Sequence, residues 1–367
     1  MLRIDRRSIQ NFDWVLLVLV SILVMMGLMN LLSATHAGVE AGTNDIFRRQ
    51  VFAAGVATAA MLGVCMIDYR RLARLAMPIY LLGLFFIVLP ILVSPATRGA
   101  QAWLFEGRVQ PSEFAKIALI LALARYFQRN PPTEITRITQ LGVPLLIIAL
   151  PVGIIALQND VGVALLTLLI GVTFLPFVRI PWPAWAGLGA AGLAGLLAFW
   201  SYGLKDYQRT RILDFLDPGR DPLSSGYQAM QSRIAVGSGG LFGTGWMEGS
   251  QTQLRFLPTQ HSDFVFSVLA EEWGFAGSAL VLGLYLVLLL WGLWVARNAK
   301  DSFGAMLAVG VVGTLFWPAT INVAMVLGLA PVIGVPLPLF SYGGSALLSA
   351  GILIGLLLNV SMRRYVF

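Results

Sequence analysis

Long apolar runs separated by short polar connections dominate the pattern of this chain. Ten such runs approach the length that an α-helix needs to cross a bilayer, about 20 residues. They lie at 14–32, 51–67, 75–93, 112–126, 141–157, 161–178, 185–202, 264–295, 303–329 and 346–360. The pattern predicts an all-α integral membrane protein with ten transmembrane helices, in which residues 1–367 form a single polytopic domain.

One polar connection is much longer than the others and covers about 205–262, between the seventh and eighth runs. It contains the glycine-rich segment 237–246, with the sequence GSGGLFGTGW. Backbone amides in such a segment are able to cradle a phosphate. The alternative is a re-entrant loop without a ligand, and the absence of a P-loop lysine favours that alternative.

The composition narrows the class of protein. Hydrophobic residues make up 57% of the 367 residues and charged residues only 12%, whereas about 25% of an average soluble domain is charged. The single cysteine, Cys65, lies inside an apolar run, which excludes a disulfide framework. The two histidines, His36 and His261, show no zinc-binding spacing. A soluble enzyme and a zinc protein are therefore not expected.

The net charge of +7 comes from Arg and Lys residues scattered over short connections. Anionic lipid headgroups explain this distribution better than nucleic acid does, because no compact basic patch is present. Alternate connections hold the basic residues Arg70, Arg71, Arg74, Arg125, Arg129, Arg137, Arg179, Arg297, Lys300, Arg363 and Arg364. The positive-inside rule then places both termini in the cytoplasm and segment 205–262 on the outer side.

Ionisable residues at the mouths of predicted membrane helices are the candidates for chemistry. Asp263 follows His261 and Ser262 directly and begins the eighth run. A charged side chain at a helix centre costs about 2.5–3.5 kcal/mol on insertion scales, so such groups pair, face water or react. A helix cap is the alternative role for Asp263. The long polar segment before it favours a functional role.

Three further charged residues lie at the predicted outer surface. Glu113 and Lys116 are three residues apart and share one helix face. They form either a structural ion pair or the charged wall of a cavity. Asp160 precedes the sixth run, where an aspartate also suits a helix N-cap. Both interpretations of each position stay open on the sequence alone.

Several segments together resemble the SEDS family (shape, elongation, division and sporulation), and most closely its elongation branch. The match covers nearly the whole chain in order, and its last block is the most specific. The segments are QPSEFAK at 110–116, QNDVGVALL at 158–166, RILDFLDPGRDPLSSGYQ at 211–228, QSRIAVGSGGLFGTGW at 231–246, FLPTQHSDFVFSVLAEEWG at 256–274 and NVAMVLGLAPVIGVPLPLFSYGGSALL at 322–348.

The resemblance implies a peptidoglycan glycosyltransferase that polymerises lipid II, the undecaprenyl-pyrophosphate-linked disaccharide peptide, during cell elongation. The enzyme would lie in the bacterial cytoplasmic (inner) membrane with its active site on the extracytoplasmic side. The resemblance also implies a class B penicillin-binding protein transpeptidase as partner. A divalent cation, Mg or Mn, is the implied cofactor.

The resemblance also suggests roles for individual residues. Asp263 would be the general base for the acceptor hydroxyl, in one displacement that inverts the donor sugar carbon. Because diphosphate is already a good leaving group, the reaction needs a base and cations rather than a strong acid. Lys116 would neutralise the phosphates, and Glu113 or Asp160 would position Lys116 or bind the metal. The other expected cavity residues are Gln110, Arg211, His261, Ser262, Ser341 and Tyr342.

Two other classes of function compete with the enzyme. A flippase for a lipid-linked precursor would use charges near the membrane midplane and kinked helices, and it would tolerate neutralisation of Asp263. A scaffold would recruit a partner enzyme and have no activity of its own. The glycosyltransferase predicts carboxylates gathered at the outer end of the bundle and loss of glycan synthesis when Asp263 is replaced. The family resemblance is the main reason to favour it.

Overall fold

The computed structural model describes residues 12–36, 43–94, 100–105, 107–130, 141–177, 180–217 and 225–364. These residues form helices joined by turns. Within them, an isolated antiparallel bridge between Leu104 and Val109 closes a short turn and does not extend into a sheet. The all-α prediction is therefore confirmed for the described part of the chain.

A helix occupies most of every apolar run expected from the sequence. These helices are α2 (Trp14–His36), α3 (Thr43–Met66), α4 (Tyr69–Val93), α5 (Pro111–Arg129), α6 (Gly142–Leu157), α7 (Val161–Val172), α8 (Trp182–Ala198), α12 (Val265–Arg297), α13 (Ser302–Val326) and α14 (Gly344–Arg363). In the part of the chain that is described, seven are long and apolar enough to cross a membrane: α2, α3, α4, α8, α12, α13 and α14. The apolar helices α6 and α7 are shorter.

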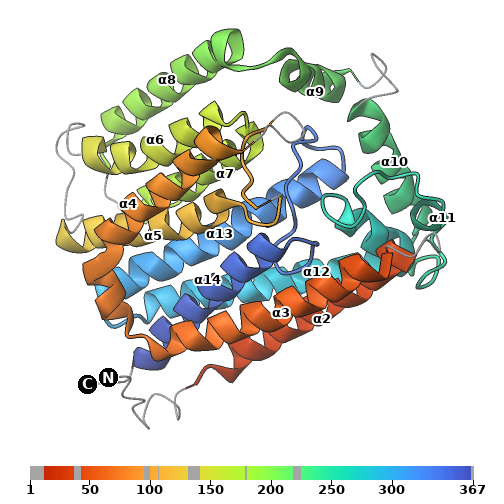
Figure 1. Ribbon diagram of the computed structural model, residues 1–367, viewed down its shortest axis with the longest axis horizontal. Coiled ribbons are helices and arrows are strands. Elements are labelled where there is room, and N and C mark those ends of the chain that lie inside the picture. The colour runs from red at the N-terminus through yellow and green to blue at the C-terminus, as the bar shows by residue number, and fades with distance from the viewer. Residues whose placement is uncertain are drawn as a thin grey trace.

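The helices differ strongly in burial. Most residues of α5, α13 and α14 are buried, so these helices form the interior of the bundle. In Figure 1, α2 and α3 lie along one side of α14, and α4 and α6 lie on the other side. Helix α8 lies at the margin, and Ala184 alone among its described residues is buried. A margin helix with apolar exposed faces suits contact with lipid.

The first and last described residues and the helices of the polar segment lie at opposite ends of the bundle (Figure 1). Ser361 near the end of α14 donates a 2.7 Å hydrogen bond to Asp13, which precedes α2. Trp291 near the end of α12 also donates to Asp13, at 3.0 Å. At the far end lie α9 (Asp206–Leu216), α10 (Ser225–Ser238) and α11 (Ser250–Gln253), so the predicted long connection contains three helices (Figure 1).

The glycine-rich segment packs against a break in α12. Gly274 interrupts this helix with a φ of 63°. At the break, the carbonyl of Glu271 accepts a hydrogen bond from the amide of Thr244 at 3.0 Å. A Cβ on Gly243 would lie 2.0 Å from the carbonyl oxygen of Glu272, so the close approach of the two backbones requires glycine. The amide of Thr244 is therefore engaged by α12 and is not part of a phosphate cradle.

Candidate functional site

The amino-terminal ends of α5, α7, α12 and α14 meet at the end of the bundle that lies opposite Asp13 and Ser361. The backbone amide of Gln110, before α5, donates to Ser345 Oγ in α14 at 3.2 Å. A Cβ on Gly162 in α7 would lie 2.9 Å from the carbonyl oxygen of Ile333. Segment 330–343, which leads from α13 to α14, therefore runs directly past the start of α7.

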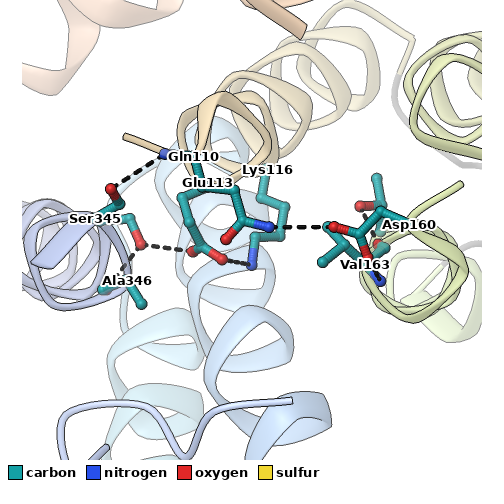
Figure 2. A network of polar contacts seen from close by, with 9 residues as sticks. Gln110, Glu113, Lys116, Asp160, Val163, Ser345 and Ala346 are labelled. Carbon is teal, nitrogen blue, oxygen red and sulfur yellow. Dashed lines mark hydrogen bonds and ion pairs between the residues drawn. The ribbon is translucent and has the colours of Figure 1, made fainter. Parts of the chain in front are cut away.

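Glu113 and Lys116 form a buried ion pair on the inner helix α5. Lys116 Nζ lies 2.8 Å from Glu113 Oε1, and Ser349 of α14 donates to Glu113 Oε2 at 2.9 Å. The exposed fractions of Glu113 and Lys116 are only 8% and 4%. Figure 2 shows this pair between Ser345 on one side and Asp160 on the other. The predicted shared face is confirmed, and each carboxylate oxygen of Glu113 has a donor.

Asp160 both caps α7 and faces the ion pair. Its Oδ1 accepts the amide hydrogen of Val163 at 3.2 Å, as an N-cap does. Its Oδ2 accepts a hydrogen bond from Gln110 Nε2 at 3.3 Å (Figure 2). Burial raises the pKa of the Asp160 carboxyl, while the hydrogen bond from Val163 and the positive charge of Lys116 oppose that shift. The N-cap role is therefore confirmed, and a functional role for Asp160 stays a prediction.

Asp263 lies in the turn that leads into α12 and is partly exposed. Asn322, a fully buried residue of α13, donates to the backbone carbonyl of Asp263 at 2.8 Å and to that of Val335 at 2.6 Å. Oδ2 of Asp263 lies 3.3 Å from the position that a Cβ on Gly334 would take, and Gly334 has a φ of +70°. The carboxylate is thus placed against segment 330–343 and is not enclosed in hydrocarbon.

His261 and Ser262 hold the turn before Asp263. The amide of Tyr342 donates to the carbonyl of His261 at 3.0 Å, and the two rings pack edge to face with centroids 5.7 Å apart. Ser262 Oγ donates to the carbonyl of Thr259 at 3.3 Å. These contacts join the approach to α12 with the approach to α14.

Ser341 lies within segment 330–343, and Arg211 contacts that segment from α9. Ser341 Oγ accepts the amide hydrogen of Leu337 at 2.8 Å, and its carbonyl accepts from Gln50 Nε2 of α3 at 3.1 Å. Arg211 of α9 donates to the carbonyl of Val332 at 3.4 Å. Ser341 therefore shapes the turn before α14, and Arg211 ties α9 to segment 330–343.

Four further polar residues hold the site but were not predicted. Ser345 and Ser349 are four residues apart in α14 and lie on one helix face, from which they reach Gln110 and Glu113. Asn322 supports Asp263, and Gln50 supports the turn at Ser341. A polar residue inside an apolar run is the signal that marks Asn322 and Ser349, because polar groups in a membrane seek partners.

The described residues do not build a metal site by themselves. Both carboxylate oxygens of Glu113 and of Asp160 accept hydrogen bonds from protein donors. In the ranges that the structure describes, no group of three or more His, Cys, Asp or Glu side chains is placed to hold a metal ion. The divalent cation implied by the resemblance stays a prediction.

Comparison with known proteins connects this geometry to a family. A relative, the peptidoglycan glycosyltransferase MrdB of Escherichia coli strain K12, is 40% identical over 291 residues, which cover 78% of this chain and 77% of the relative. The solved rod shape determining protein RodA of Thermus thermophilus has a TM-score of 0.71 and 32% identity, and the match covers 96% of this chain and 98% of that chain.

A second solved structure concerns the coordination of polymerization and crosslinking by a peptidoglycan synthase complex. One of its chains matches with a TM-score of 0.82 and 35% identity, over 97% of this chain and 99% of that chain. The family model described as cell cycle protein, for FtsW, RodA and SpoVE, matches residues 13–366. The chain therefore belongs to the FtsW/RodA/SpoVE family, which is the SEDS family.

Proposed function

We infer that this chain is a peptidoglycan glycosyltransferase that polymerises lipid II into glycan strands. The observation that carries the inference is the placement of Asp263. It is a partly exposed carboxylate, fixed through its backbone by Asn322 and packed against Gly334. The ion pair of Glu113 and Lys116 lies at the same end of the bundle.

The reaction that this arrangement supports is a single displacement. Asp263 accepts the proton of the acceptor hydroxyl while that oxygen attacks the donor sugar carbon and the diphosphate leaves with its electron pair. The amino-terminal ends of α5 and α7 favour negative charge on the leaving diphosphate. One displacement inverts the configuration of the donor carbon.

The proposed topology has ten spans in the bacterial cytoplasmic membrane. It adds the buried α5 and the shorter α6 and α7 to the seven long apolar helices. The basic residues near the chain termini support a cytoplasmic location for both termini. Asp263 and helices α9 to α11 then lie on the extracytoplasmic side, where the lipid-linked substrate would be used.

The proposed partner is a class B penicillin-binding protein transpeptidase, which would crosslink the new strand. The similarity to a chain of a peptidoglycan synthase complex supports a partner of this kind. Exposed apolar side chains on the membrane helices, such as Phe52, Phe85 and Leu81, are available to lipid or to a partner's helix. A scaffold role alone would not require the arrangement around Asp263.

The test uses the purified full-length protein with labelled lipid II and sizes the products on a gel. Asp263→Asn keeps the size of the side chain and removes the base, so we expect turnover to fall by about 10²–10⁴-fold. Asp206→Asn, at an exposed position of α9, is the matched control and should polymerise normally. Undiminished polymerisation by folded Asp263→Asn protein would refute Asp263 as the base. Absence of polymerisation by the folded wild-type protein would refute the glycosyltransferase and favour the flippase.

A further inference from the structure

A cavity of about 340 Å³ lies at the end of the bundle opposite Asp263. Its volume falls within the range of small-molecule sites, about 300–1,000 Å³. A Cβ on Gly304, beside the cavity, would lie 3.4 Å from both Tyr69 and Val360, which places this region near the end of α14. The residues that line the cavity are Arg70, Ala73, Arg125, Gln128, Lys300, Asp301 and Phe303. We call it the basic cavity.

The lining of the basic cavity has an excess of positive charge. Arg70 comes from α4, Arg125 from α5, and Lys300 from the connection before α13, so three different segments bring cations to one place. Asp301 is the one acid among the described lining residues. Like charges that converge in this way repel one another, and an anion between them would relieve the repulsion.

Asp301 compensates these cations only in part, because its carboxylate already has other partners. Oδ1 caps α13 by accepting the amide hydrogen of Gly304 at 2.9 Å. Oδ2 accepts a hydrogen bond from the hydroxyl of Tyr69, and Arg70 Nε lies 3.9 Å from it, at the outer limit of an ion pair. The acid therefore serves mainly to hold α13 against α4.

The remaining contacts shape the cavity for a small anion with an apolar attachment. Gln128 accepts a 2.6 Å hydrogen bond from Arg125 Nη1, which orients the guanidinium without neutralising it. Arg70 and Lys300 are exposed, whereas Ala73 and Phe303 are buried and supply apolar surface. Guanidinium groups bind carboxylate and phosphate oxygens with two parallel hydrogen bonds. A phosphate offers more oxygens than a carboxylate to cations that come from three sides, so phosphate fits this cavity better.

We propose that the basic cavity binds a phosphate group through Arg70, Arg125 and Lys300. Two sources share this chemistry, the headgroup of an anionic phospholipid and a soluble phosphate ester. Basic pockets between membrane helices on the cytoplasmic side are typical headgroup sites. The proposed topology puts the cavity at that surface, so an anionic phospholipid is the source that we expect.

The first experiment measures lipid retention by the intact protein. Full-length protein is reconstituted into phosphatidylcholine nanodiscs that contain one fifth phosphatidylglycerol. The lipid that stays bound to the protein is then counted by native mass spectrometry. Affinity for phosphatidylglycerol should fall about fivefold for each cavity charge removed. The double variant Arg70→Gln/Arg125→Gln should therefore show the largest loss. Lys300→Gln, at an exposed position where folding is not at risk, should show the single-charge loss.

The matched control is Arg297→Gln. Arg297 is exposed at the same end, at the close of α12, and does not line the cavity. It reports the general attraction of surface charge for anionic lipid and should lose less than Lys300→Gln does. Equal losses for Arg297→Gln and Lys300→Gln, together with no binding of a soluble phosphate, would overturn the proposal.

The second experiment distinguishes the two sources. Glycerol 3-phosphate and inorganic phosphate are titrated calorimetrically into protein held in pure phosphatidylcholine nanodiscs. Binding that is lost in Lys300→Gln and kept in Arg297→Gln supports the site with a soluble ligand. Selective retention of phosphatidylglycerol without such binding supports the site with a lipid headgroup.

Discussion

Charged side chains are buried at one end of the bundle and largely exposed at the other. At the end near Asp263, the buried Glu113 and Lys116 neutralise each other within 2.8 Å and Ser349 completes the acid's hydrogen bonds. At the other end, Arg70 and Lys300 are exposed, and the acid of the cavity lining, Asp301, is held mainly by Tyr69 and its helix cap.

This difference follows from the cost of burying charge. A buried charge without a partner costs several kcal/mol, so the interior ion pair has to be complete before any ligand arrives. Exposed cations keep much of their hydration, so their charge does not have to be fully matched inside the protein. The end near Asp263 is therefore preorganised by the chain itself, whereas the basic cavity has net charge left for a ligand from outside.

The largest expected effect comes from breaking the internal pair. Lys116→Met leaves Glu113 buried without its cation, which should lower the free energy of unfolding by about 3–5 kcal/mol. Lys300→Met makes the same substitution at an exposed position, and surface changes usually cost less than about 0.5 kcal/mol. Unfolding in mixed micelles measures both values, and equal losses would refute the contrast between the two ends.

Asn322 and Asn359 form a matched pair across the bundle. Both are fully buried, and Asn359 donates to the carbonyl of Val64 at 2.7 Å as Asn322 donates to that of Asp263 at 2.8 Å. Alanine at either position leaves buried carbonyls without donors and should cost about 1–3 kcal/mol of stability. Turnover per folded molecule should fall for Asn322→Ala with little change in KM, and should stay normal for Asn359→Ala.

A substitution at Gly334 tests how closely segment 330–343 positions Asp263, the proposed base. Gly334→Ala should cost about 1–2 kcal/mol, because a residue with a side chain disfavours positive φ. Its new methyl group would also lie 3.3 Å from Asp263 Oδ2. Gly328→Ala has the same backbone cost at a φ of +71°, but there the methyl would meet the flexible Arg233 side chain. Polymerisation should fall only for Gly334→Ala, and a parallel fall in both would contradict the contact.

The smallest effect on stability is expected at Asp160. Asparagine is as good an N-cap as aspartate, so Asp160→Asn should leave the free energy of unfolding nearly unchanged. Asp160→Ala loses the cap of α7 and should cost about 0.5–2 kcal/mol. If the charge of Asp160 serves substrate binding, both variants should raise KM for lipid II equally. A raised KM for Asp160→Ala alone would show that only the cap matters.

Much of the fold was predictable because it depends on local patterns. A helix occupies most of each apolar run, Pro111 begins α5, and Asp160 caps α7 as its position suggests. The spacing of Glu113 and Lys116 places them on one face without reference to the rest of the chain. The helices α9 to α11 were missed, because their segments are polar and lack the continuous hydrophobicity that marks a span.

The supporting residues of the site were not predictable in the same way. Asn322 is 59 residues from Asp263, and Ser349 is 236 residues from Glu113. The role of Gly334 as the neighbour of Asp263 depends on the path of segment 330–343 between α7 and α12. No local pattern encodes such separations.

The sequence by itself determined that this protein is a helical membrane protein with an acid at the start of its eighth apolar run. Hydrophobicity and helix geometry act over neighbouring residues and so can be read along the chain. Only the tertiary structure decided that the ion pair is closed by α14 and that Asp263 rests against Gly334. It also decided that three cations from separate segments share one cavity. Packing brings these groups together, and burial then dictates which charges must be paired.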